Sequence, residues 1–172
     1  MEESGSEAVF GKCVDRNLQD SVAKFSETEG RLTLQRHEGM FIEATAFIRR
    51  ETFLKFKFDE SFGVGTFYGA EEAYDLILRM LKLDTKINYS PEILLYHPPK
   101  IVNHTGIQEI KRVFTYRCGF SHLCIKHGLY RKLIERLTKV SIYILYLSVF
   151  NRKKVRYYIA EWLGLMTGIC VR

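Results

Sequence analysis

Two adjacent carboxylates, Glu71 and Glu72, follow a loop over residues 58–69 that contains three glycines. Glycine lets a substrate approach the backbone closely, and a carboxylate at the edge of a cleft can act as a general base. Acidic side chains in the first turn of a helix also complement the helix dipole, and each contributes about 0.3–1 kcal/mol. The pattern is therefore consistent with either a catalytic base or a helix-stabilising pair.

The carboxylates need a helix to hold them, and residues 71–81 have the required pattern. Five apolar residues recur there at helical spacing, which predicts one face directed at a core. They are Ala73, Leu76, Ile77, Met80 and Leu81. The preceding residues 58–69 are too rich in glycine for a strand interior and too irregular for a helix. We therefore expect a loop that leads directly into the start of a helix.

The other predicted elements are strands in the first part of the chain and helices in the second. Apolar and β-branched runs predict strands at residues 8–10, 41–48, 86–89 and 93–97, with helical turns at 51–56. The polar residues 20–38 are expected to form a surface excursion. Helical periodicity predicts helices at residues 108–127, 130–150 and 153–168. This order indicates an α/β fold with a short mixed sheet, followed by a helical tail.

Length and composition set the class of protein. The chain has 172 residues, 47% hydrophobic and 27% charged, which is typical of one folded globular domain. Residues 1–97 carry 12 basic and 17 acidic side chains, whereas residues 98–172 carry 14 basic and 3 acidic ones. The basic second part favours an anionic partner, either nucleic acid or an anionic membrane surface.

The four cysteines do not form a CxxC pair, and the N-terminus does not resemble a secretion signal. Cys118, His122, Cys124 and His127 lie close in sequence, which raises the question of a zinc site. On a helix, however, Cys124 would point away from the face that carries Cys118 and His122. We therefore expect reduced thiols that pack in the core or at the surface and do not bind zinc.

Residues 140–150 form the longest apolar stretch, at eleven residues against the roughly 20 that span a bilayer. Basic residues flank this stretch on both sides, and three aromatic residues follow it. The flanking residues are Arg131, Lys132, Arg136, Lys139, Arg152, Lys153, Lys154 and Arg156, and the aromatic ones are Tyr157, Tyr158 and Trp162. Such a segment is typical of a helix that lies in the membrane interface. The alternative is a core helix with solvated ends.

Four segments resemble, in order, the second half of family 2 glycosyltransferases. They are residues 44–51 (ATAFIRRE), 58–65 (FDESFGVG), 68–79 (YGAEEAYDLILR) and 89–98 (YSPEILLYHP). Members of this family have a GT-A fold, in which an N-terminal half binds the nucleotide and a later half supplies the acceptor site and the base. The resemblance implies that residues 1–100 are this later half of a GT-A domain. Residues 101–172 would then be a helical tail that can lie on a membrane.

The resemblance also assigns the site residues. The family carries an acidic pair whose second member deprotonates the acceptor, which implies Glu72 as the base and Glu71 as the alternative. An ungapped alignment on Asp75-Leu76 places Ala73 at the base position, and a one-residue shift restores Glu72. The resemblance implies that the acceptor is bound by Gly65, Tyr68, Gly69, Asp75 and Arg49. It also implies that His97 is a ligand of a divalent metal, Mn²⁺ or Mg²⁺.

The family's Asp-x-Asp motif does not occur in the chain, and only 46 residues precede Phe47. The resemblance therefore implies a C-terminal fragment that is inactive without a donor-binding half. The implied reaction transfers sugar from a nucleotide-sugar donor to a glycan or lipid-linked acceptor in surface polysaccharide synthesis. We expect a location in the cytoplasm, peripheral on the inner face of the cell membrane.

Two other functions are compatible with the sequence. In the first, the chain is a non-catalytic scaffold on a membrane, and the acids only stabilise a helix. In the second, the basic part binds nucleic acid. The basic residues coincide with apolar, aromatic helices and with no nucleic-acid recognition motif, so the sequence favours lipid and predicts no nucleic-acid partner.

Overall fold

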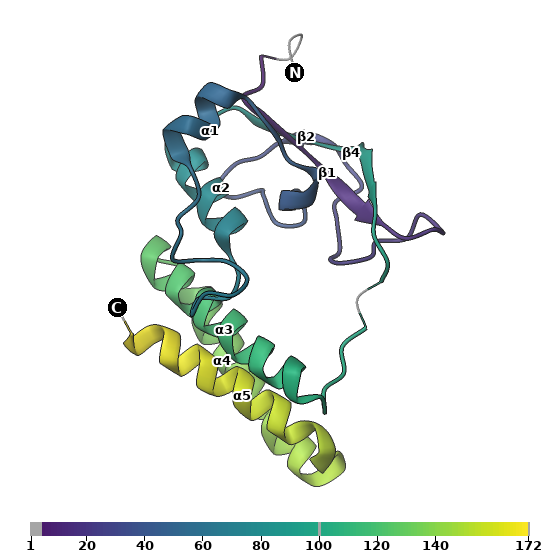
Figure 1. Ribbon diagram of the computed structural model, residues 1–172, viewed down its shortest axis with the longest axis vertical. Coiled ribbons are helices and arrows are strands. Elements are labelled where there is room, and N and C mark those ends of the chain that lie inside the picture. The colour runs from purple at the N-terminus through teal and green to yellow at the C-terminus, as the bar shows by residue number, and fades with distance from the viewer. Residues whose placement is uncertain (1–4, 100, 172) are drawn as a thin grey trace. The chain divides into compact units, whose positions relative to one another are not determined.

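The computed structural model describes residues 5–99 and 101–171 and shows a mixed α/β protein (Figure 1). The chain divides into two compact units. The first contains residues 1–58 and 76–101, and the second contains residues 59–75 and 102–172. The sequence-based division at residue 100 lies next to one of these boundaries, but it placed residues 59–75 in the first part, whereas they group with the C-terminal helices.

A small four-stranded sheet organises the first unit. Its strands are β1 (Ala8–Val14), β2 (Gly30–Arg31), β3 (Phe47–Ile48) and β4 (Ile87–Tyr96). The strand order is β2-β4-β1-β3, with β1 parallel to β4 and the two outer strands antiparallel to their neighbours. The short mixed sheet predicted from the sequence is confirmed.

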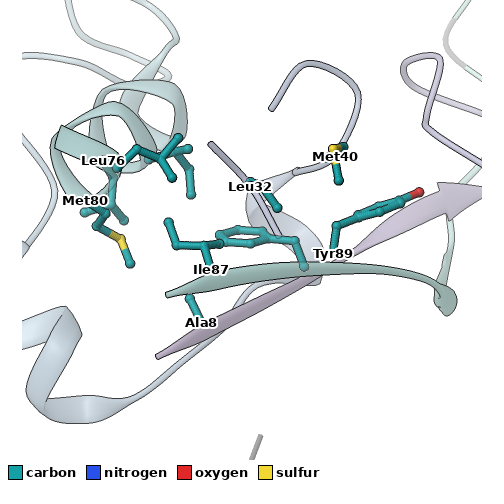
Figure 2. Packing of buried hydrophobic residues seen from close by; sticks show 10 residues of the cluster. Ala8, Leu32, Met40, Leu76, Met80, Ile87 and Tyr89 are labelled. Atoms are coloured by element: carbon teal, nitrogen blue, oxygen red, sulfur yellow. The ribbon is translucent and has the colours of Figure 1, made fainter. Parts of the chain in front are cut away.

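Buried apolar side chains pack between this sheet and helix α2 (Glu72–Lys82), whose residues 76–82 belong to the first unit. Figure 2 shows Leu76 and Met80 of α2 on the same side of the sheet as Ile87 and Tyr89 of β4. Leu76, Ile77, Met80 and Leu81 are all buried, so the predicted apolar face is confirmed. The helix begins one residue later than predicted, at Glu72.

Strand β4 is continuous, although the sequence predicted two strands separated at Ser90-Pro91. The register with β1 passes from Phe10 opposite Tyr89 to Lys12 opposite Leu94, so β4 bulges at this point. Proline is tolerated at a bulge because no ladder hydrogen bond is lost there. Gly11 lies opposite the bulge, where an added Cβ would come within 2.1 Å of the Ile93 carbonyl oxygen.

The strand predicted over residues 41–48 is wrong for most of its length. Only Phe47–Ile48 pairs as β3, and Glu43–Thr45 forms a 3-10 turn, the element η1. The Thr45 hydroxyl accepts a hydrogen bond from the Gly11 amide at 3.0 Å. A side-chain hydroxyl that bonds to backbone groups in this way competes with strand pairing. The helical turns predicted next are confirmed as α1 (Arg50–Phe56).

Residues 20–38 are largely irregular, as expected, but they are not only a surface excursion. Leu32 belongs to the buried core, and Phe25 and His37 are buried as well. The Tyr89 hydroxyl donates to the Ser26 carbonyl at 2.7 Å, which holds the segment against β4.

Three helices form most of the second unit and confirm the predicted helical tail. They are α3 (Ile107–His127), α4 (Tyr130–Phe150) and α5 (Arg152–Cys170). Gly128 ends α3 in the left-handed conformation, with φ of 73°. The cysteines are free, with Cys13, Cys118 and Cys124 buried and Cys170 exposed. Within the described residues, no helix combines the length and apolar character that crossing a bilayer requires.

Helix α5 approaches α3 closely through two glycines one turn apart (Figure 1). An added Cβ at Gly164 would lie 2.3 Å from the Phe114 carbonyl oxygen, and one at Gly168 would lie 2.3 Å from the Cys118 carbonyl oxygen. Both distances are too short for any side chain. The two glycines therefore set the separation of the two helices.

We expect Gly168→Ala to lower the free energy of unfolding. Helix propensity alone would make this change stabilising by about 0.5–1 kcal/mol, whereas overpacking costs about 1–3 kcal/mol. A decrease in the free energy of unfolding would therefore show that the two helices approach too closely at Gly168 to admit a methyl group. Thermal and urea unfolding followed by circular dichroism measure it, with Met166→Ala on the exposed side of α5 as control. A stabilised Gly168→Ala protein would contradict the helix packing described here.

Candidate functional site

The glycine-rich loop before α2 is closed by its own hydrogen bonds. The Gly63 amide donates to the Tyr68 carbonyl at 2.9 Å, and the Thr66 hydroxyl donates to the Gly63 carbonyl at 2.9 Å. Gly63 and Gly65 have φ of 123° and 96°, which side chains other than glycine rarely adopt. The loop therefore has a defined shape that depends on these glycines.

Glu72 is the first residue of α2 and lies beside this loop. Its carboxyl carbon is 3.8 Å from the position that a Cβ on Gly63 would occupy, which is an ordinary van der Waals distance, so the carboxylate lies beside the backbone of the loop. The residue is partly buried. Among the residues that the structure describes, none forms a hydrogen bond or ion pair with this carboxylate. Glu72 is thus held in place by the helix while its charge is uncommitted.

Glu71 differs from Glu72 in its backbone conformation. Its φ is 82°, an uncommon value for a residue with a side chain. Its carbonyl accepts the hydrogen bond from the Asp75 amide at 2.8 Å that opens the helix. Strained backbone persists where the surroundings enforce it, and such positions cluster at functional sites. Glu71 therefore turns the chain so that Glu72 becomes the first helical residue.

Asp75 is fully buried and holds the first turn of α2 against the end of α3. Its Oδ1 lies 2.7 Å from Lys126 Nζ and 2.8 Å from His127 Nε2. Lys126 also reaches Asp59 Oδ2 at 2.6 Å, so one ammonium group joins the loop to the helix. The resemblance assigned Asp75 to acceptor binding, whereas its burial and these contacts are those of a positioning residue.

Asp59 has a strongly lowered pKa. Burial alone would raise the pKa, but hydrogen bonds from Lys126 and Ser61 outweigh it and lower the pKa from 3.8 to about 2. A carboxyl whose pKa is lower in the folded protein stabilises the fold above its unfolded pKa. This contribution is therefore complete above about pH 4 and is lost as the pH falls toward 2.

Lys126→Met should raise the pKa of Asp59 from about 2 back toward the ordinary value of 3.8. The substitution removes both the hydrogen bond and the charge that favour the ionised carboxyl. A pH titration of the Asp59 carboxyl carbon by NMR measures the change, with Lys111→Met on the exposed part of α3 as control. If the pKa stays near 2 without Lys126, the ammonium group does not join the loop to the helix.

Aromatic rings support the loop from the α3 side. His122 stacks on Tyr68 with ring centroids 4.1 Å apart and planes at 15°, and Phe62 lies 5.5 Å from His122. Burial lowers the pKa of His122, as does the nearby charge of Lys126. Tyr68 is 8% exposed, and Gly69 lies against Thr115. Both residues were predicted to bind acceptor, and here they form the packed base of the loop, whereas Gly65 is exposed.

The remaining predicted site residues lie in the first unit. Arg49 Nε donates to the Ser6 carbonyl at 2.8 Å. His97 follows the end of β4 and is exposed, with Nδ1 2.7 Å from the Pro98 carbonyl oxygen. It lines a hollow of about 580 Å³ together with Asp15 and Tyr96. The structure therefore describes Gly65, Tyr68, Gly69, Glu71, Glu72 and Asp75 as one group, and Arg49 and His97 separately.

No known protein family, curated protein or solved structure matches the chain.

The described residues do not fit a divalent metal. No group of three or more His, Cys, Asp or Glu side chains within residues 5–99 and 101–171 could hold a metal ion. His97 has only a backbone carbonyl beside its Nδ1, which does not make a metal site.

Lys126 and His127 contact Asp75 in the candidate site, and the sequence did not identify either contact. His127 was considered only as a zinc ligand, and Lys126 only as part of the basic charge. Both lie in the last turn of α3, where cations complement the helix dipole. A basic pair at the end of a long helix was the available signal, but nothing in the sequence shows which carboxylate it meets.

Proposed function

We propose that this chain supplies the acceptor side and the catalytic base of a family 2 glycosyltransferase with a GT-A fold. One observation supports the proposal above the others: the carboxylate of Glu72 at the start of α2 lies beside the glycine-rich loop and forms no hydrogen bond or ion pair within the described residues. A carboxylate without such partners is available to accept a proton from a bound hydroxyl.

The chemistry requires a base because a sugar hydroxyl is a poor nucleophile. In the proposed reaction, a Glu72 carboxylate oxygen lies about 2.6–3.2 Å from the acceptor hydroxyl and takes its proton. The acceptor oxygen then forms a bond to the anomeric carbon of the donor sugar. The bond from that carbon to the nucleoside diphosphate breaks on the opposite face, so the configuration at the anomeric carbon inverts.

The buried charges around Asp75 would serve this reaction by positioning. Lys126 and His127 hold Asp75 at 2.7 and 2.8 Å, three residues along the helix from Glu72. An error of about 1 Å in the placement of a catalytic group can cost 10²-fold in rate. Fixing the first turn of α2 therefore fixes the base.

Donor binding belongs to other residues in this proposal. The donor-binding half and any Mn²⁺ or Mg²⁺ would come from a nucleotide-binding half joined to this chain, and the complete transferase is the two together. We expect the isolated chain to show no measurable calorimetric binding of a nucleoside diphosphate with Mn²⁺. Micromolar binding by the isolated chain would contradict this division. The proposal also implies a location in the cytoplasm, on the inner face of the cell membrane.

Turnover of the complete transferase tests the proposal. A panel of nucleotide sugars is offered with glycan and lipid-linked acceptors, and release of nucleoside diphosphate is followed. Activity that requires Glu72 supports the enzyme. If no donor is turned over by the complete protein, the non-catalytic scaffold remains, with Glu71 and Glu72 serving only the helix dipole.

A further inference from the structure

Helix α4 carries an apolar stripe on the side that does not pack against the rest of the second unit. Its buried side includes Leu133, Val140 and Leu147, which belong to the core of the second unit. On the exposed side, the spacing i, i+3, i+4, i+7, i+8 places a second set of apolar residues in one line. They are Ile142, Leu145, Tyr146, Val149 and Phe150. Leu145, Val149 and Phe150 are 71–73% exposed, far more than a core helix requires.

Aromatic rings run along this stripe. The Tyr143 and Tyr146 rings stack with centroids 5.8 Å apart, and the Tyr146 and Phe150 rings lie 4.8 Å apart. Tyrosine combines an apolar ring with a polar hydroxyl, which suits it to a boundary between an apolar and an aqueous phase. The rings therefore give the stripe the composition of a membrane interface segment.

Unpaired cations border the stripe at both ends. Lys139 precedes it on the same side of α4, and Arg152, Lys153 and Lys154 follow it in the first turn of α5. Within the described part of the chain, no carboxylate forms an ion pair with any of the four. Cations in a first helical turn are opposed by the helix dipole, so helix stability does not explain their position.

Two hollows are lined by cations of this region, and residues of the stripe line the first of them. One, of about 670 Å³, is lined by Lys139 and Arg136 at its basic side and by Ile142, Tyr143 and Tyr146 at its apolar side. The other, of about 660 Å³, is lined by Arg152, Lys153 and Arg156. Each hollow offers positive charge, and the first offers apolar surface beside it. Both hollows suit a negative headgroup, and the first also suits the hydrocarbon chain attached to it.

We infer that the exposed stripe of α4, with the cations of its two ends, docks on the surface of a bilayer that contains anionic lipid. The stripe enters the boundary between headgroups and acyl chains, and the cations bind headgroup phosphates. An interfacial helix of this kind buries its apolar face by roughly 5–10 Å without crossing the membrane. A second copy of this chain fits less well, because it would bring the same unpaired cations against one another.

Cosedimentation of the full chain with vesicles tests this inference. We expect binding to phosphatidylcholine vesicles that contain phosphatidylglycerol, weak binding to phosphatidylcholine alone, and release as salt is raised. Equal binding to both vesicles would overturn the role of the cations. A chain that stays in the supernatant at low salt, or that forms dimers through the stripe instead, would overturn the docking itself.

Two variants separate the two parts of the surface. Arg152→Gln with Lys153→Gln and Lys154→Gln should weaken partitioning roughly 100-fold, since each cation near an anionic surface contributes about fivefold. The double variant Leu145→Ser with Val149→Ser should abolish sedimentation with the vesicles at the same salt concentration. Leu83→Ser, at an exposed apolar residue outside this helix, is the control and should leave binding unchanged. Unchanged binding of either α4 or α5 variant would contradict the assignment of that part.

The depth of the stripe provides a measurement that does not depend on loss of binding. In a Trp162→Phe background, which removes the natural tryptophan, a tryptophan placed by Phe150→Trp should be quenched by lipids brominated near the top of their chains, whereas one placed by Leu83→Trp should not be. Circular dichroism verifies that each variant retains its helices. These readouts do not involve Glu72, so the membrane inference and the proposed catalytic function can fail separately.

Discussion

Glu72→Gln should lower the turnover of the complete transferase by about 10²–10⁴-fold, the usual contribution of a general base. Glutamine keeps the size of the side chain and its place in the first turn of α2, but it cannot accept a proton. Because the carboxylate forms no hydrogen bond or ion pair within the described residues, the substitution should leave the fold intact. Steady-state kinetics with saturating donor measure the loss.

Two neighbouring glutamates provide matched controls for this loss. Glu60→Gln changes an exposed carboxylate of the same loop and should leave turnover unchanged. Glu71→Gln tests the alternative base, and we expect a much smaller effect than that of Glu72→Gln because Glu71 acts through its backbone turn. If Glu71→Gln is the more damaging substitution, the two roles are reversed.

Glu161→Ala should give the largest loss of stability. Glu161 is 1% exposed, and its Oε1 accepts hydrogen bonds at 2.8 Å from both Arg117 Nε and Arg136 Nε. Alanine would leave two guanidinium groups facing each other with no counter-charge. Removing one partner of a buried ion pair costs about 3–5 kcal/mol. Both guanidiniums are about a third exposed to water, which screens them, so we expect about 3 kcal/mol.

A loss of this size should lower the melting temperature by roughly 6–12 °C in a chain of this length. Thermal and urea unfolding followed by circular dichroism measure it. The control is Glu135→Ala, which removes an exposed pair with Arg131 and should cost about 0–1 kcal/mol. Equal losses for the two variants would show that the buried position of Glu161 contributes nothing.

The long helices could be predicted because their periodicity continues over many turns. Helices α3, α4 and α5 begin and end within two residues of the predicted limits, with Gly128 and Asn151 between them. In the sheet, the sequence failed where a contact distant in the chain decides the structure. The bulge that joins β4 across Pro91 depends on Gly11, about 80 residues earlier, and no local pattern shows this pairing.

The candidate site could be predicted only in part for the same reason. The loop, its glycines and the start of α2 are local features, and they are present as predicted. Asp75 lies on the opposite side of α2 from Leu76, Ile77 and Met80, so the helical pattern alone places it in solvent. It is buried because Lys126 and His127 meet it from another helix. A single sequence does not reveal this contact between two helices.

The pH dependence of kcat/KM of the complete transferase tests the central claim most directly, namely that Glu72 removes the acceptor proton. A base must be ionised to act, so kcat/KM should fall in acid, where the base is protonated. We predict that Glu72→Gln removes this acidic limb and that Glu60→Gln preserves it. An acidic limb of unchanged slope and midpoint in Glu72→Gln would contradict the assignment of Glu72 as the base.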